Sequence, residues 1–173
     1  MLFKICISAV IIGCTSSLGI IYANTFVERT RFLANLIYAL QILETEIVYT
    51  NTPLPEVLIK TANKTSSEIT RIFENTANIL LRKEGYIFSE AWKKAIDESN
   101  NIKKINQEDK ELLISLGNGL GISNTQDQIK HIDLVRAGIK RNYESSLISQ
   151  KKNTRLYKNL GLLLGLTIVV IFF

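Results

Sequence analysis

The sequence has few of the residues on which catalysis and metal binding depend. Its 173 residues include a single histidine, His131, and only two cysteines, Cys6 and Cys14. No phosphate-binding loop, dinucleotide-binding glycine pattern or zinc-ligand spacing is present. A lone histidine on a polar helix is most often a surface or hydrogen-bonding residue. We therefore predict no catalytic residue, no metal site and no cofactor, and we expect a protein that is not an enzyme.

The two cysteines do not form a disulfide framework either. Both lie in the first apolar segment, and on a helix Cys6 and Cys14 are about 12 Å apart along the axis. That separation is too long for a disulfide bond.

Proline is also scarce, with two residues, and no stretch alternates apolar and polar residues as a strand does. Apolar residues instead recur every three or four positions, as on one face of a helix. The clearest such row in the first half is Leu33, Leu36, Leu40, Leu43 and Ile47. The fold class predicted is all-α: a compact bundle of about six helices, with long first and last helices that extend into membrane segments.

Several local signals indicate where these helices begin. Thr52 and Pro53 are typical of an N-cap and a first helical residue. Ser89 is a candidate N-cap for a later helix that carries Trp92, which we expect to anchor the core. Ser123, with Gln126 three residues on, predicts a capping box at the start of the last helix.

Charged residues are nearly absent from both ends of the chain. Lys4 is the only charged residue before Glu28, and none follows Lys158. The apolar segment 5–23 is close to the ~20 residues that a membrane-spanning helix needs. The tail from Leu160 forms only about 21 Å of helix, which is too short to cross the membrane core alone. It crosses the membrane only if the preceding helical turn is also inserted and the Lys158 side chain extends to the lipid headgroups. We therefore predict a membrane segment at 1–24, a helical bundle domain at 25–158 and a second membrane segment at 159–173.

The first apolar segment has two other interpretations. It can be a signal peptide that is removed at Ala23. It can also be a lipoprotein signal, since residues 11–14 resemble a lipobox with Cys14 as the lipidated residue. The alternative function is then an exported or lipid-anchored helical interaction domain.

Two sets of residues are candidates for membrane contacts. The cations that precede the tail are expected at the membrane interface, against anionic lipid headgroups, and they are Lys151, Lys152, Arg155 and Lys158. Small residues spaced by four let membrane helices approach closely. We expect the two end helices to pack through such residues, which are Ala9, Gly13, Ser17, Gly161 and Gly165.

The net charge of +5 is modest and gives no reason to expect a nucleic-acid partner. Nucleic-acid binders usually show a basic stripe or a platform of aromatic residues. Here the basic pairs in the middle of the chain alternate with acidic residues such as Glu84, Glu90 and Asp97. A solvated charged surface accounts for this pattern. We expect most acidic residues to be exposed, Glu44 and Glu46 among them.

The order of motifs along nearly the whole chain resembles the stage III sporulation protein AB family of endospore-forming bacteria. The resemblance depends on residues 40–49 leading into Thr52-Pro53-Leu54, on Ala91-Trp92, on residues 116–121 and on residues 128–132. The basic helix that leads into an apolar C-terminus completes it. Each motif is weak alone, and their order and spacing make the set specific.

The resemblance implies a part in the channel complex between mother cell and forespore. It implies a cytoplasmic helical domain, similar to those of platform proteins in type II secretion and type IV pilus systems. It further implies that this domain links a cytosolic secretion-type ATPase to membrane proteins of the channel, in the mother-cell membrane that faces the forespore. The charges agree with this topology, because Arg29 and Arg31 follow the first segment and positive residues favour the cytoplasmic side.

Overall fold

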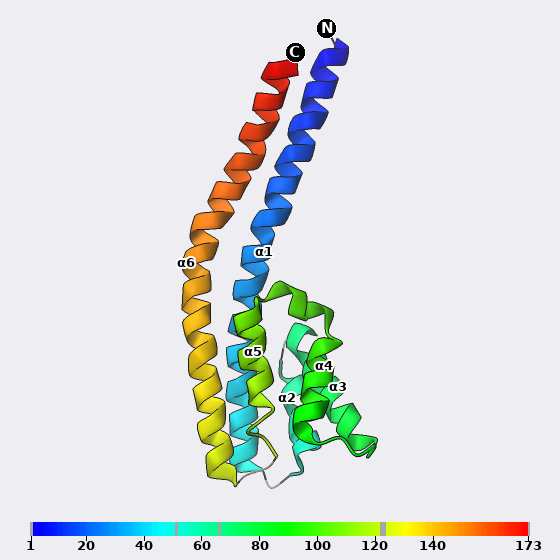
Figure 1. The fold of residues 1–173 in the computed structure, drawn as a ribbon, viewed down its shortest axis with the longest axis vertical. Helices are drawn as coiled ribbons and strands as arrows, with labels where there is room; N and C mark the ends of the chain where they lie inside the picture. Colours follow the sequence, from blue (N-terminus) through cyan, green and yellow to red (C-terminus); the bar gives the residue numbers. More distant parts are fainter. Residues whose placement is uncertain (1, 51, 66, 122–123, 173) are drawn as a thin grey trace. The chain divides into compact units, whose positions relative to one another are not determined.

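The computed structural model describes residues 2–50, 52–65, 67–121 and 124–172, and within them it contains helices and no strand (Figure 1). The elements in chain order are α1 (Leu2–Tyr49), α2 (Leu54–Asn63), α3 (Ser67–Leu81), α4 (Phe88–Asp97), a 3₁₀ helix η1 (Asn100–Lys104), α5 (Gln107–Leu116) and α6 (Thr125–Phe172). The prediction of an all-α fold with about six helices is confirmed. The predicted unbroken course of the first and last helices is also confirmed, since α1 and α6 each extend over 48 residues.

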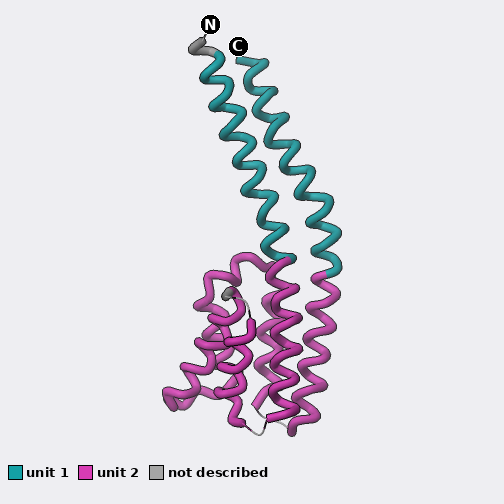
Figure 2. Tube along the Cα trace, turned by 180° about the vertical axis from the view of Figure 1, so that it is seen from behind, with its two compact units in different colours: residues 1–30, 144–173 teal, residues 31–143 magenta. Residues whose placement is uncertain are grey.

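The chain divides into two compact units (Figure 2). The first, here called the terminal unit, contains residues 1–30 and 144–173, and the second, the central unit, contains residues 31–143. The terminal unit is larger than the two predicted membrane segments, because residues 25–30 and 144–158 are grouped with it. The helices α1 and α6 each contribute residues to both units.

The core of the central unit consists of the apolar rows that the sequence predicts. Leu33, Leu36, Leu40 and Leu43 of α1 are buried, and Ile47 is half-buried. From the short helices the core takes the buried residues Leu58, Ile69, Ile72, Phe73, Trp92, Ile96, Leu113 and Leu116. From α6 it takes Ile132, Val135 and Ile139. One continuous core therefore joins all six α-helices.

Trp92 anchors this core as predicted. Its indole is fully buried, and its ring packs against Phe73 and Phe88 at centroid distances of 5.2 and 5.9 Å. Its Nε1 donates a hydrogen bond of 2.7 Å to the backbone oxygen of Leu113. The side chain therefore connects α4 to both α3 and α5.

The helix ends follow local chemistry, with two differences from the sequence-based expectations. Helix α4 begins at Phe88, two residues earlier than a Ser89 cap requires, because Phe88 is buried against Trp92. The first turn is closed instead by Glu90, whose Oε2 accepts the Ile87 backbone N–H at 3.3 Å. The 3₁₀ helix η1 was not predicted; its Ile102 packs against the core.

Other helix ends also follow local chemistry. Asn106 caps α5, accepting the Asp109 N–H at 2.8 Å, as its position before two acidic residues predicts. Gly85, with φ of +86°, lies in the turn after α3, where glycine has no steric penalty. The predicted Ser123 cap lies outside the described residues; Asn124 Oδ1 accepts the Asp127 N–H at 2.9 Å at the start of α6.

Candidate functional site

The two ends of the chain form a closely packed helix pair within the terminal unit. Gly19 of α1 and Gly161 of α6 are buried and face each other. A Cβ atom added at Gly161 would lie 2.7 Å from the Thr15 backbone oxygen and 3.0 Å from the Gly19 Cα. One added at Gly165 would lie 2.9 Å from the Ile12 Cα. The backbones thus touch at positions where only glycine fits, the arrangement found between membrane helices.

Of the five predicted packing residues, the two on α6 lie in this contact and the three on α1 do not. Gly161 and Gly165 lie in the contact. Ala9, Gly13 and Ser17 are exposed, and a Cβ added at Gly13 would meet nothing within 4 Å. The expectation that these three residues of α1 contact α6 is therefore wrong.

The contact surface of α1 is a different row of small residues, which the sequence-based reasoning missed. Thr15, Gly19 and Ala23 follow one another at a spacing of four, and the last two are buried. Both rows have the same spacing, and the two lie on opposite sides of the helix, about 200° apart at 100° per residue. The signal was present in the sequence, but nothing in it distinguishes the two faces.

An aromatic cluster continues this contact toward the central part of the chain. Tyr157 of α6 packs against Tyr22 and Phe26 of α1, with ring centroids 4.5 and 5.7 Å apart. Tyrosine is enriched where membrane helices reach the water interface. The cluster lies beside Lys158, the last charged residue of the chain.

The outer surfaces of the pair are apolar and exposed. Two helices are long and apolar enough to cross a membrane, one formed by α1 and one by α6. Their large exposed side chains include Ile5, Val10, Leu18, Ile21, Leu163, Leu164, Val170 and Ile171. A continuous surface of this kind is costly in water and favourable in lipid.

The four predicted interface cations are exposed on α6. They are Lys151, Lys152, Arg155 and Lys158. Over the described part of the chain, none of them forms an ion pair with a carboxylate. Their charges are therefore available to an external anion.

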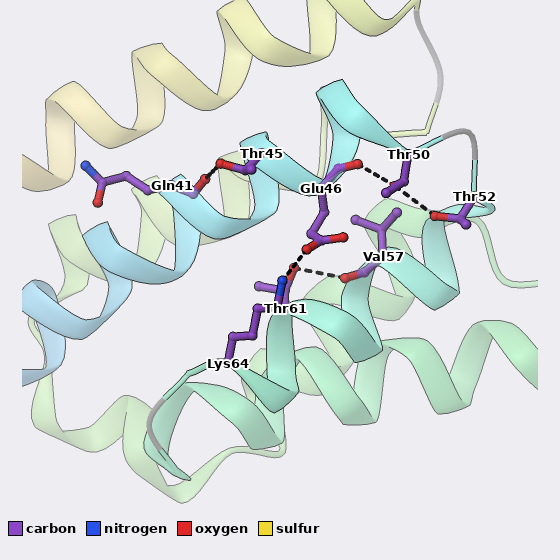
Figure 3. Close-up of polar contacts among 8 residues, drawn as sticks. All are labelled: Gln41, Thr45, Glu46, Thr50, Thr52, Val57, Thr61 and Lys64. Atoms are coloured by element: carbon purple, nitrogen blue, oxygen red, sulfur yellow. Dashed lines mark hydrogen bonds and ion pairs between the residues drawn. The ribbon is translucent and has the colours of Figure 1, made fainter.

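Polar contacts in the central unit join its helices. Figure 3 shows Lys64, which follows α2, with its Nζ 2.6 Å from the Glu46 carboxylate of α1. Glu46 is only 8% exposed, which differs from the expectation of an exposed acid. The pairing with Lys64 accounts for the burial, because a buried charge is tolerated when it is paired.

Other polar side chains also join helices of the central unit. The buried Asp109 of α5 accepts a hydrogen bond of 2.8 Å from Asn142 Nδ2 of α6. Arg136 contacts both Glu44 of α1 and Asp133 of its own helix. His131 Nε2 lies 2.8 Å from the Ser115 oxygen, so the prediction of a hydrogen-bonding histidine is confirmed.

Glu68 of α3 is the carboxylate with the clearest electrostatic environment. Burial alone would raise the pKa of Glu68, but hydrogen bonds from Lys104 and Arg31, each at 2.8 Å, outweigh it and hold the pKa below its ordinary value. A depressed pKa stabilises the folded state at neutral pH, and this stabilisation is lost as the pH falls through the folded-state pKa.

The substitution Glu68→Gln should therefore destabilise the protein at pH 7 and have no effect below the folded-state pKa. We expect a loss of roughly 1 kcal/mol at pH 7, since Arg31 is largely exposed and screened. The measurement is the free energy of unfolding of both proteins between pH 7 and pH 3. A difference between them that stays constant over this range would contradict the assignment.

The described residues contain no group of three His, Cys, Asp or Glu side chains placed to hold a metal ion. Cys6 and Cys14 are both exposed on α1 as free thiols. The features that stand out are therefore the helix pair, its apolar surface and its basic flank.

Comparison with known proteins gives a consistent result. The family model described as "Stage III sporulation protein AB (spore_III_AB)" matches residues 4–173. The protein "Stage III sporulation protein AB" of Bacillus subtilis (strain 168) is 28% identical over 161 residues, which cover 93% of this chain and 94% of that protein. A solved structure, "Stage III sporulation protein AB (SpoIIIAB)", is similar with a TM-score of 0.64 and 25% identity, covering 72% of this chain and 98% of that chain.

Proposed function

Because this chain belongs to the stage III sporulation protein AB family, we propose that it is a membrane-held, non-enzymatic platform protein of endospore formation. In this proposal the two terminal helices cross the mother-cell membrane that faces the forespore. The central helices form a cytoplasmic domain that links a cytosolic secretion-type ATPase to membrane proteins of the channel complex.

The glycine contact between α1 and α6 is the observation that carries the proposal. A pair of helices that buries Gly19 against Gly161 and exposes its large apolar side chains outward is suited to lipid. A domain held by such a pair can transmit force or position from a cytosolic partner to the membrane without chemistry of its own.

Charge supports the proposed orientation and the proposed spans at 1–24 and 159–173. Arg29 and Arg31 follow the first span, four cations precede the second, and only Lys4 lies at the outer ends. Cations favour the cytoplasmic side of a membrane. The Tyr22 and Tyr157 rings mark a level at which both helices can leave the hydrocarbon.

Labelling of single cysteines tests the topology. In a background with Cys6 and Cys14 replaced by alanine, one cysteine replaces Glu84, which is exposed in the turn after α3. Two others are placed in short extensions before Met1 and after Phe173. We expect a membrane-impermeant maleimide to label both extensions in intact cells and to label position 84 only after permeabilisation. Labelling of position 84 in intact cells would remove the ATPase as a partner and favour the exported or lipid-anchored domain.

A further inference from the structure

A groove lies along α6 just before the uncharged tail. Its volume is about 630 Å³, and it is lined by Leu147, Gln150, Lys151, Thr154, Arg155 and Lys158. All of these residues belong to the terminal unit. Three cations thus line a single depression.

The three cations in this groove have no carboxylate partner. Among the residues described, none of Lys151, Arg155 and Lys158 forms an ion pair. Like charges on one helix face repel one another, so an anion bound between them is favoured.

We propose that this groove is a binding site for the phosphate group of an anionic phospholipid. Lys151, Arg155 and Lys158 donate hydrogen bonds to the phosphate oxygens and neutralise their charge. Arginine and lysine are the usual partners of phosphate, arginine through its planar fork and lysine as a point charge. This inference rests on the proposed membrane function and adds to it a defined lipid site in place of a diffuse positive collar.

A second groove beside the first favours a lipid over a soluble phosphate. It has a volume of about 350 Å³ and is lined by Lys152, Arg155, Leu156, Asn159, Leu160 and Leu163. Arg155 lines both grooves. A headgroup held at Arg155 therefore has an apolar surface next to it for an acyl chain, which inorganic phosphate or a nucleotide could not use.

The test titrates the purified full-length protein in neutral detergent with short-chain phosphatidylglycerol, and native mass spectrometry counts the lipids bound. Lys151→Gln and Lys158→Gln should each weaken binding about fivefold, as expected for one cation at a lipid headgroup.

Arg29→Gln is the matched control. It removes one positive charge that follows the first proposed span and lines neither groove, and we expect less than a twofold change. Equal losses for Lys151→Gln, Lys158→Gln and Arg29→Gln would reduce the site to a diffuse positive collar and overturn the proposal. Full competition by inorganic phosphate at equal concentration would also overturn it, because the ligand would then be soluble.

A separate measurement distinguishes failure of the site from failure of the proposed function. Flotation with vesicles of phosphatidylcholine alone reports membrane insertion without any anionic headgroup. Lys151→Gln and Lys158→Gln should float like the wild type. If the wild type itself fails to float, the membrane role is wrong and the lipid site is overturned with it; if it floats but binds no phosphatidylglycerol, only the site is overturned.

Discussion

Replacing Gly161 with leucine is expected to separate the two terminal helices. The first atom of the new side chain would lie 2.7 Å from the Thr15 oxygen and 3.0 Å from the Gly19 Cα. Both obstacles are backbone, so no side-chain rotation can relieve the overlap. Overpacking of this kind costs about 1–3 kcal/mol, and in lipid no hydrophobic force between the helices compensates for it.

Crosslinking measures this separation. Cysteines replace Tyr22 and Tyr157, whose ring centroids are 4.5 Å apart, in a background without Cys6 and Cys14. A short bifunctional maleimide should join them efficiently when Gly161 is present. With Gly161→Leu we expect the yield to fall roughly tenfold, which corresponds to about 1.4 kcal/mol.

Gly13→Leu is the matched control on the other helix. The two changes add the same side chain, but nothing lies within 4 Å of a Cβ at Gly13. The yield should therefore stay at the wild-type level. A loss of crosslinking with Gly13→Leu and none with Gly161→Leu would mean that the helices meet through the Ala9, Gly13 and Ser17 row, as the sequence alone suggested.

The two rows of small residues on α1 show what the sequence alone could not predict. A spacing of four identifies small residues that share a helix face, and α1 has two such rows on opposite sides. The tail has only one pair of glycines, Gly161 and Gly165, so the sequence leaves a single choice there. Which face of α1 turns to α6 depends on the partner surface, and the sequence of one helix does not contain that information.

The core of the central unit was more predictable, because its helices are amphipathic. Leu33 and Leu36 of α1 and Ala91 and Ala95 of α4 are buried as their spacing predicts. Each helix there has one apolar face and no competing one.

The polar contacts between helices were not predictable. Asp109 with Asn142 and Glu46 with Lys64 join residues far apart in the sequence. No local pattern indicates such partners, which is why Glu46 was expected at the surface.

Trp92→Ala is expected to cause the largest loss of stability in the central unit. The change removes a fully buried indole that packs between Phe73 and Phe88. It also leaves the Leu113 carbonyl without the 2.7 Å hydrogen bond from Nε1. Loss of a buried tryptophan costs about 3–5 kcal/mol. Measured by hydrogen exchange of the full-length protein, amides of α3, α4 and α5 should exchange at least 100-fold faster.

Trp92→Phe separates packing from hydrogen bonding at the same position. Phenylalanine keeps an aromatic ring between Phe73 and Phe88 but cannot donate to the Leu113 oxygen. We expect a loss of about 1–2 kcal/mol, much of it from the carbonyl left unpaired, and a correspondingly smaller increase in exchange. If phenylalanine were as damaging as alanine, the hydrogen bond and not the ring packing would hold α4 to α5. Because α5 also contributes Asp109 to the contact with Asn142, exchange in α6 near Asn142 should then rise as well.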